Sequence, residues 1–188
     1  SGDAESVPAR FQNTDTPRCT YLSAVSADVH RHLEALREAW SEDGGNFISD
    51  FADAGNNRET FATTQEAIDK LVNTIVFVSE ELVQKMKLGG PLAVSSDGED
   101  VDPDAAEAMF SETSKEDIIS SLEGIERTYS ETEGNSLSDY TRFRQQRVDE
   151  LVKTSLDEAI SAVEDIEGPL HVAVQERREQ VENAHDAV

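Results

Sequence analysis

The feature of this sequence that most restricts its fold is the spacing of its apolar residues, which recur every three or four positions. Between about 17 and 41 they form one stripe: Leu22, Val25, Val29, Leu33, Leu36 and Trp40. This is the period of an amphipathic helix, whereas a half-buried strand alternates at every second residue. No segment alternates for long enough to make a sheet, so the chain is predicted to be all-α.

Other segments have the same helical period, and turn residues separate them. We expect helices over about 64–88, from Ser114 to about 133, from just after Ser138 to 167, and from Leu170 to the end. A short helical turn is expected at 47–51. Glycine and proline at 89–91 and 168–169 stop two of these helices. Long helices joined mostly by short connections predict an antiparallel up-and-down bundle of four to five helices.

Several positions inside these helices carry more specific expectations. The β-branched run at 75–78 is compatible with a strand, but the helical spacing on both sides favours a helix. In that helix, Met86 is expected to face the core. Gly124 costs helix stability, so it is expected to mark close packing against another backbone. In the fourth helix, the predicted apolar stripe includes Phe143, Val148 and Leu151.

The expected domain organisation is a flexible N-terminal arm at 1–15 and one helical-bundle domain at 16–188, with a long acidic loop at 89–113. A calcium-binding EF-hand loop needs glycine at its sixth position and glutamate at its twelfth. Counting from Asp97 or Asp100, the sixth residue is Asp102 or Ala105, and neither register has a glutamate at the twelfth. A solvated acidic loop is therefore expected.

The charge of the chain excludes some classes of partner. It has 40 acidic and 16 basic side chains, a net charge of -24, which repels nucleic acid and anionic membrane surfaces. No apolar run reaches the roughly 18 residues that a membrane-spanning helix needs. The acidity fits a salt-rich source, an ordinary acidic protein or a surface that collects cations. The first residues show no signal-peptide pattern, which leaves the compartment open.

Motifs that carry chemistry are sparse. The single cysteine, Cys19, excludes an internal disulfide and is expected to be a small buried side chain. His30 and Glu34 lie four residues apart in the first helix, so they share a face and are candidate metal ligands, but two ligands make an incomplete site. The pattern His-Glu-x-x-His is absent, and Glu-x-x-His occurs once, at 182–185, whereas a di-iron bundle needs it twice. Metal catalysis by this chain alone is therefore not expected.

Three motifs follow one another in a recognisable order. The first is Arg-Cys-Thr-Tyr-Leu at 18–22, opening a helix that reaches Trp40; the second is Lys-Leu-Gly-Gly-Pro-Leu at 87–92. The third is Ser-Glu-Thr-Ser-Lys-Glu-Asp at 111–117, followed by Leu-Glu-Gly at 122–124. In order and spacing, these motifs resemble the later part of the imelysin family. These are iron-regulated cell-envelope proteins once described as insulin-cleaving proteases.

The resemblance implies an extracytoplasmic location, in the periplasm or at the cell surface, and a link to iron uptake or another iron-regulated envelope function. Iron is a possible cofactor of a full-length protein. Family members are longer, with two helical halves, and their proposed metal signature, Gly-x-His-x-x-Glu, is absent here. The chain is therefore expected to be a non-catalytic binding protein, whose partner is a missing N-terminal half or another envelope protein.

The same resemblance supplies candidate ligand-binding residues. Ser111, Ser114 and Asp117 match the polar run of the family at the mouth of its third helix, and a helix N-terminus with hydroxyls can bind an anion. Their alternative role is that of a helix cap. Arg18 and Tyr21 match the opening motif, and their alternative role is packing or hydrogen bonding across the bundle.

Two other functions stay open. One is a helical protein–protein interaction module without a small ligand, which should expose an apolar stripe on its last helix. The other is a metallopeptidase, which needs a metal that activates water.

Overall fold

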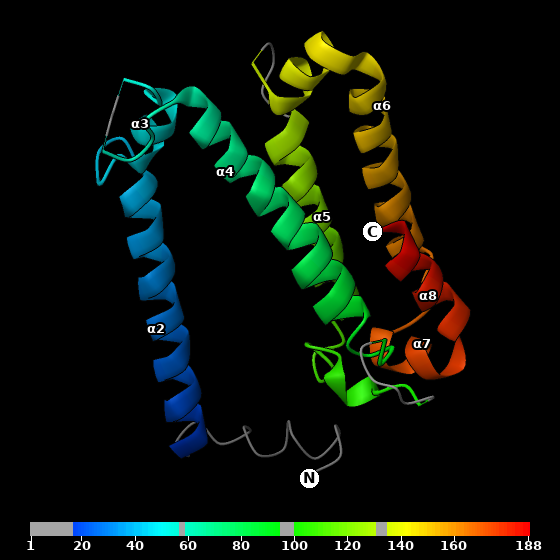
Figure 1. The fold of residues 1–188 in the computed structure, drawn as a ribbon. Helices are drawn as coiled ribbons and strands as arrows, with labels where there is room; N and C mark the ends of the chain where they lie inside the picture. Colours follow the sequence, from blue (N-terminus) through cyan, green and yellow to red (C-terminus); the bar gives the residue numbers. More distant parts are fainter. Residues whose placement is uncertain (1–16, 57–58, 95–99, 131–134) are drawn as a thin grey trace. The chain divides into compact units, whose positions relative to one another are not determined.

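The computed structural model describes residues 17–56, 59–94, 100–130 and 135–188, and most of these residues are helical (Figure 1). No strand occurs in these ranges, so the all-α prediction is confirmed. The expected arm at 1–15 lies outside the described residues. The chain divides into two compact units, 1–71 and 72–188, which are described in turn.

In the first unit, helix α2 (Pro17–Trp40) is followed by a tight turn and the short helix α3 (Phe47–Ala52). A Cβ atom on Gly44 would lie 2.2 Å from the carbonyl oxygen of Glu38, so the turn needs a residue without a side chain there. The N–H of Gly45 donates to the same carbonyl oxygen at 2.9 Å. The glycine pair therefore ends the helix.

An aromatic cluster holds the turn together. The ring of Trp40 packs edge-on against Phe47 and stacks on Phe51, with centroid distances of 4.9 and 5.8 Å. Phe61 adds a further ring, 4.7 Å from that of Phe51. These contacts lie at the C-terminal end of α2, and the remaining length of α2 has no buried residue.

The helix predicted at 64–88 is present, but its second half has an unusual geometry. It begins as α4 (Thr64–Val76), capped by Thr63, whose hydroxyl accepts the N–H of Glu66 at 3.2 Å. It continues as η1 (Phe77–Leu88), a π-helix in which each backbone N–H bonds to the carbonyl five residues back. The N–H of Gly89 closes the last such turn on the oxygen of Gln84 at 2.7 Å.

The wider turn of η1 changes which side chains reach the core. Val83 and Leu88 are completely buried, whereas Met86 is 63% exposed. The prediction that Met86 faces inward is wrong. It assumed 3.6 residues per turn, whereas this segment is a π-helix with more residues in each turn. Each π turn takes up an extra residue, so the inward positions move towards the C-terminus.

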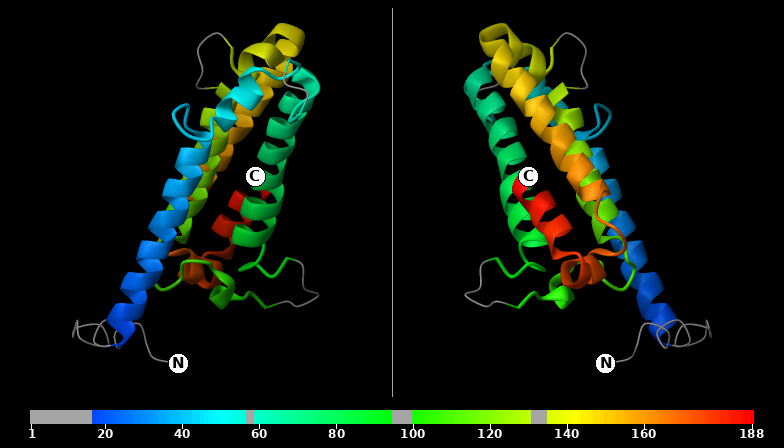
Figure 2. Two further views of the ribbon diagram at one scale, coloured as in Figure 1. Left: turned by 90° about the vertical axis from the view of Figure 1, so that its left-hand side faces the viewer. Right: turned by 90° about the vertical axis from the view of Figure 1, so that its right-hand side faces the viewer.

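The second unit is an antiparallel helical bundle. After η1 come a 3₁₀ turn, η2 (Pro103–Ala105), then α5 (Ser114–Ser130), α6 (Leu137–Glu164), α7 (Leu170–Glu176) and α8 (Arg178–Ala187). Helix α5 packs against both η1 and α6, and α8 returns to pack against α6 and η1 (Figures 1 and 2). Neighbouring long helices run in opposite directions, which confirms the predicted bundle architecture.

The core of this unit lies where η1, α5, α6, α7 and α8 meet. Each large apolar side chain that is buried there contributes about 1.5–3 kcal/mol to folding. The core residues with no exposed surface are Val83, Leu88, Ile118, Val163, Ala173, Val174, Val181 and Ala184.

Two backbone breaks depart from the sequence prediction. Gln145 has φ -151° and ψ 84°, which kinks α6, and Phe143 and Leu151 on either side are 91% and 64% exposed. Their predicted inward orientation is therefore wrong. Arg177, with φ -138° and ψ 40°, divides the last predicted helix into α7 and α8. The break lets both short helices bury apolar residues, so the last helix does not expose the apolar stripe that was expected.

The described parts of the acidic loop are tied to the bundle. Leu92 and Ala106 are buried, and the N–H of Asp102 donates to the carbonyl of Pro91 at 2.8 Å. Lys87 forms an ion pair with Glu107 across the base of the loop. The loop thus contributes to the core as well as to the acidic surface. Within the described residues, no helix is both long and apolar enough to cross a bilayer.

The expectation for Gly124 is also wrong. A Cβ atom added to this residue, in the middle of α5, would have no neighbouring atom within 4 Å. The glycine thus costs helix stability without permitting a close approach of another backbone.

Leu88 and Met86 provide a test of the π-helical register. Replacing buried Leu88 by Ala should reduce the free energy of unfolding by about 2–5 kcal/mol, because it leaves a cavity. Met86→Ala, at an exposed position, should change it by no more than about 0.5 kcal/mol. Urea unfolding followed by circular dichroism measures both. The reverse order of effects would show that this segment is an α-helix.

Gly124→Ala should stabilise the protein by roughly 0.5–1 kcal/mol, because alanine restricts the unfolded chain and meets open space in the folded one. The same unfolding assay measures the change. A loss of stability would contradict the open surroundings of Gly124.

Candidate functional site

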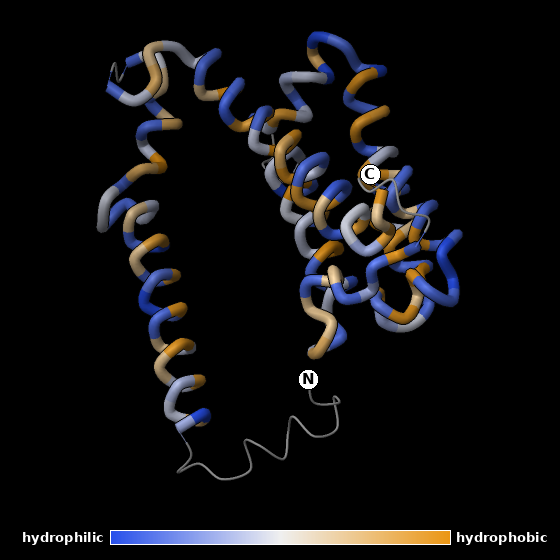
Figure 3. The backbone as a smooth tube through the Cα atoms, turned by 60° about the horizontal axis from the view of Figure 1, so that its bottom comes forward, coloured by the Kyte–Doolittle hydropathy of each residue, from blue (hydrophilic) through white to orange (hydrophobic). Residues whose placement is uncertain are grey.

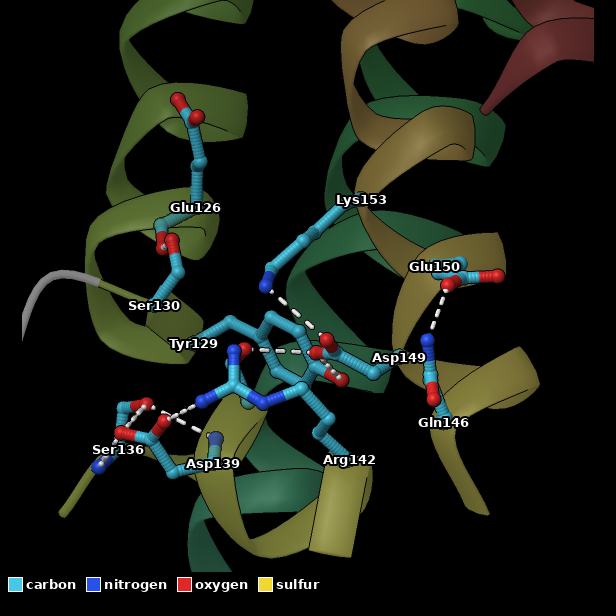
Figure 4. A network of polar contacts seen from close by, with 11 residues as sticks. Glu126, Tyr129, Ser130, Ser136, Asp139, Arg142, Gln146, Asp149, Glu150 and Lys153 are labelled. Carbon is cyan, nitrogen blue, oxygen red and sulfur yellow. Dashed lines mark hydrogen bonds and ion pairs between the residues drawn. The ribbon is translucent and has the colours of Figure 1, made fainter. Parts of the chain in front are cut away.

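The most distinctive polar site in the described chain surrounds Asp149, which is 2% exposed and is the one buried charged residue in those ranges. Its Oδ1 accepts hydrogen bonds from Ser138 Oγ at 2.6 Å and from the hydroxyl of Tyr129 at 3.1 Å. Its Oδ2 accepts a bond from Lys153 Nζ at 3.0 Å. The cluster joins α5 to both parts of α6 (Figure 4).

The kink in α6 makes this cluster possible. Ser138 and Asp149 are eleven residues apart, which is about 16 Å along a straight helix. Because the backbone breaks at Gln145, the first part of α6 folds back and brings the Ser138 hydroxyl to the carboxylate.

A capping box fixes the start of the folded-back segment. The hydroxyl of Ser136 accepts the N–H of Asp139 at 3.0 Å, and the N–H of Ser136 donates to Asp139 Oδ2 at 3.2 Å. Arg142 pairs with the same carboxylate. These contacts begin α6 at a defined residue and so set the position of Ser138.

The hydrogen bonds determine the charge of the carboxyl group. Burial by itself raises the pKa of Asp149, but the bonds from Ser138, Lys153 and Tyr129 outweigh burial and hold the pKa below its ordinary value. For Tyr129, burial raises the pKa; a hydrogen bond with Thr141 opposes that rise and the neighbouring Asp149 adds to it. The native cluster therefore holds an ionised Asp149 beside a neutral Tyr129.

This arrangement suits structure better than catalysis. Both oxygens of Asp149 are occupied, and a lowered pKa makes a carboxylate a poor proton acceptor at neutral pH. Lys153, whose side chain is 39% exposed, already neutralises the charge. The cluster therefore fixes the packing of α5 against the kinked α6.

An apolar cavity of about 270 Å³ adjoins this region of the second unit. Its lining has only two serines as polar members, and it lacks the convergent polar groups that orient a reacting substrate. It is lined by Ile75, Ser79, Leu122, Ile125, Leu151, Val152, Ser155, Leu156, Ala159, Ala187 and Val188. Its chemistry suits a small apolar group.

A family model described as Imelysin (peptidase M75) matches residues 3–188. This chain belongs to the imelysin family. No curated protein and no solved structure matches it. Members of the imelysin family are generally extracytoplasmic.

In this imelysin-family chain, the residues predicted at the mouth of α5 stabilise their own loop. Both serine hydroxyls bond to the backbone of Ala108. The N–H of Ala108 donates to Ser114 Oγ at 3.2 Å, and its carbonyl accepts from Ser111 Oγ at 3.2 Å. Asp117 lies on the exposed side of the first turn and donates its N–H to the carbonyl of Thr113. The structure thus brings Ser111 and Ser114 together around a backbone segment.

Arg18 and Tyr21 lie together at the start of α2. With Pro17 and Leu22 they line a hollow of about 350 Å³, and the Tyr21 side chain is 73% exposed. Ligand binding there stays a prediction. Cys19, expected to be buried, is half-buried in the same turn.

The candidate metal ligands also lie on α2. His30 and Glu34 are exposed, and Glu34 is 3.7 Å from Arg37. In the described residues no group of three or more His, Cys, Asp or Glu side chains could hold a metal ion. These residues therefore do not fit an iron site by themselves.

Asp149 was missed as a site residue, although the sequence contains a signal for it. It precedes Val152, Leu156 and Val163 at intervals of three, seven and fourteen residues, so it shares their side of α6. A charged residue on an otherwise apolar helix face indicates a buried polar contact.

The contribution of the Asp149 cluster can be measured by Asp149→Asn. The amide keeps the size of the side chain but removes the charge, so stability at neutral pH should fall by about 1–3 kcal/mol. Asp157→Asn, at an exposed position on the same helix, is the matched control and should change stability by no more than about 0.5 kcal/mol. Equal effects of the two variants would contradict the structural role of Asp149.

The stabilisation by Asp149 should also depend on pH. Because its native pKa is lowered, ionised Asp149 stabilises the fold above the ordinary value of about 4, and this contribution is lost as the pH falls through the native pKa. The stability difference between wild type and Asp149→Asn should therefore narrow below about pH 4. A difference that stays constant down to the acid transition would contradict the lowered pKa.

Proposed function

We propose that this chain is an extracytoplasmic binding protein of the imelysin family, associated with iron uptake or another iron-regulated function of the cell envelope. It acts by binding a partner, which is an N-terminal half of the protein or another envelope protein, and it is not a catalyst. The family match supports the compartment and the iron association.

The observation that favours binding over catalysis is the chemistry of the described residues. No group of three or more His, Cys, Asp or Glu side chains there could hold a metal ion. The one buried charged residue in those ranges, Asp149, has both carboxylate oxygens occupied by hydrogen bonds.

Two other functions have less support. A metallopeptidase would need the Gly-x-His-x-x-Glu signature, which this sequence lacks, or another set of ligands for a metal that activates water. A helical interaction module without any iron association is equally compatible with the side chains of the described residues. It differs from our proposal only in having no link to iron uptake or to another iron-regulated function of the cell envelope.

Iron titration of the purified chain, followed by calorimetry and elemental analysis, tests whether this chain holds iron by itself. Because the described residues do not fit an iron site, we expect no stoichiometric binding. Stoichiometric binding that is lost in His30→Ala would overturn the proposal in favour of a direct iron site on α2. Hydrolysis of a peptide substrate that stops on addition of a chelator would overturn the non-catalytic role.

The iron association is tested separately. The amount of this protein in its source cells should rise when a chelator limits iron, and an unchanged amount would contradict that part of the proposal.

A further inference from the structure

We propose that η1 is a conformational switch, which exchanges π-helical for α-helical hydrogen bonds and thereby moves the base of the acidic loop at 89–113. The switch lies entirely within the second unit, and it is independent of the function proposed above. Three observations support it: the length of the π-helix, a second apolar face in the same segment, and backbone constraints where the segment ends.

The π-helical part of this helix is unusually long. η1 has 12 residues, whereas π-helices occur mostly as single turns within an α-helix, and frequently at functional sites. Its last turn closes with the N–H of Gly89 on the carbonyl oxygen of Gln84 at 2.7 Å. The next N–H, that of Gly90, follows the α-helical pattern and donates to the oxygen of Met86 at 3.3 Å. The two patterns thus meet at the end of η1, where a shift by one acceptor converts one into the other.

The buried residues of η1 require the π pattern. Hydrophobic and hydrophilic residues alternate at short intervals along this segment (Figure 3). Val83 and Leu88, its two completely buried residues, are five positions apart, which is about one π turn. In an α-helix the same two side chains would lie about 140° apart around the axis, so they could not both face the core.

A second set of apolar residues in η1 fits the α pattern. Ile75, in the last turn of α4, packs against the core. Leu82 and Met86 follow it by seven and eleven residues, so in a continuous α-helix both would lie within about 20° of its direction. In the structure both border a hollow of about 420 Å³. A change from π to α bonding therefore exchanges Leu88 for Met86 in the core, and these two side chains are similar in volume.

The backbone at the end of η1 is constrained in the π pattern. A Cβ atom on Gly89 would lie 2.7 Å from the carbonyl oxygen of Lys85, so this turn excludes a side chain there. Four residues later, Ala93 has φ 56°, a left-handed conformation that residues with a Cβ atom rarely adopt. Constraints of this kind cluster at segments that switch between conformations. An α-helical turn would relieve the first of them, because alanine is well accommodated in an α-helix.

The end of η1 is bonded to the acidic loop, so a change of pattern moves both. The carbonyl groups of Leu88 and Gly89 accept the N–H groups of Leu92 and Val94 at 3.2 and 3.0 Å. Leu92 is buried in the same core as Leu88. An α-helical η1 turns Leu88 away from this core and carries the bonded loop residues with it. A molecule that binds the loop in one of the two positions therefore selects one hydrogen-bond pattern of η1.

Nuclear magnetic resonance of the full chain tests the switch directly. Couplings across hydrogen bonds identify the acceptor of the Gly89 N–H, which is Gln84 in the π form and Lys85 in the α form. Relaxation dispersion should detect exchange throughout 77–94, with the α form making up about 1–10% of the molecules. A wild-type chain without exchange in this segment, or one whose Gly89 N–H bonds to Lys85 alone, would overturn the proposal.

Two substitutions should change the exchange in opposite directions. Gly89→Ala strains the π turn and favours the α turn, so it should raise the population of the α form roughly tenfold. Met86→Gln places an amide where the α form buries an apolar side chain, so the exchange should disappear. Gly124→Ala makes the same change as the first variant in the open middle of α5, and this matched control should leave the exchange unchanged.

The variants also show which results contradict the switch. Equal effects of Gly89→Ala and Gly124→Ala on the exchange, or exchange that persists in Met86→Gln, would overturn the proposal. Circular dichroism confirms that the helices of each variant are intact. Met86 is an exposed position, so Met86→Gln decides the question even where Gly89→Ala does not fold.

Discussion

The second unit depends on burying apolar side chains at the end of the bundle where η1, α5, α6, α7 and α8 converge. Val83, Ile118, Val163, Val174 and Val181 come from these five helices, one from each, and none of them retains exposed surface. Hydrophobic burial has no direction of its own, so a helix can be distorted if the distortion brings more apolar surface inside. The π-helical turns of η1, the kink at Gln145 and the break at Arg177 all occur in helices that supply this core.

The Asp149 cluster is a consequence of the same requirement. Once α6 bends, the hydroxyl of Ser138 is buried and needs a partner, because an unsatisfied polar group in the interior costs more than a hydrogen bond gains. Asp149 accepts that bond together with two others, and Lys153 supplies the opposite charge. The buried charge thus stabilises the bend and makes one orientation of the first part of α6 preferable to others.

The sequence was sufficient to predict the fold class, the bundle and most helix limits, because apolar periodicity and the stop signals at 89–91 and 168–169 are local. It was insufficient where a helix departs from 3.6 residues per turn. Met86 and Phe143 were placed inward by extending a regular period through η1 and through the kink. At Gly124 the sequence predicts the loss of helix stability correctly. It does not predict the open space around this residue, because that space depends on tertiary packing. Ser114 was selected by its motif, and its role as a ligand-binding residue stays a prediction. Asp149 lies on an apolar helix face, which the sequence shows, but its bond to Ser138 depends on the bend in α6.

The charge of the chain acts on its partners rather than on its fold. The chain has 40 acidic and 16 basic side chains, and in the described residues Asp149 is the one buried carboxylate. An acidic surface repels another acidic surface. A partner of this chain must therefore bring basic groups, or bury enough apolar surface to outweigh that repulsion.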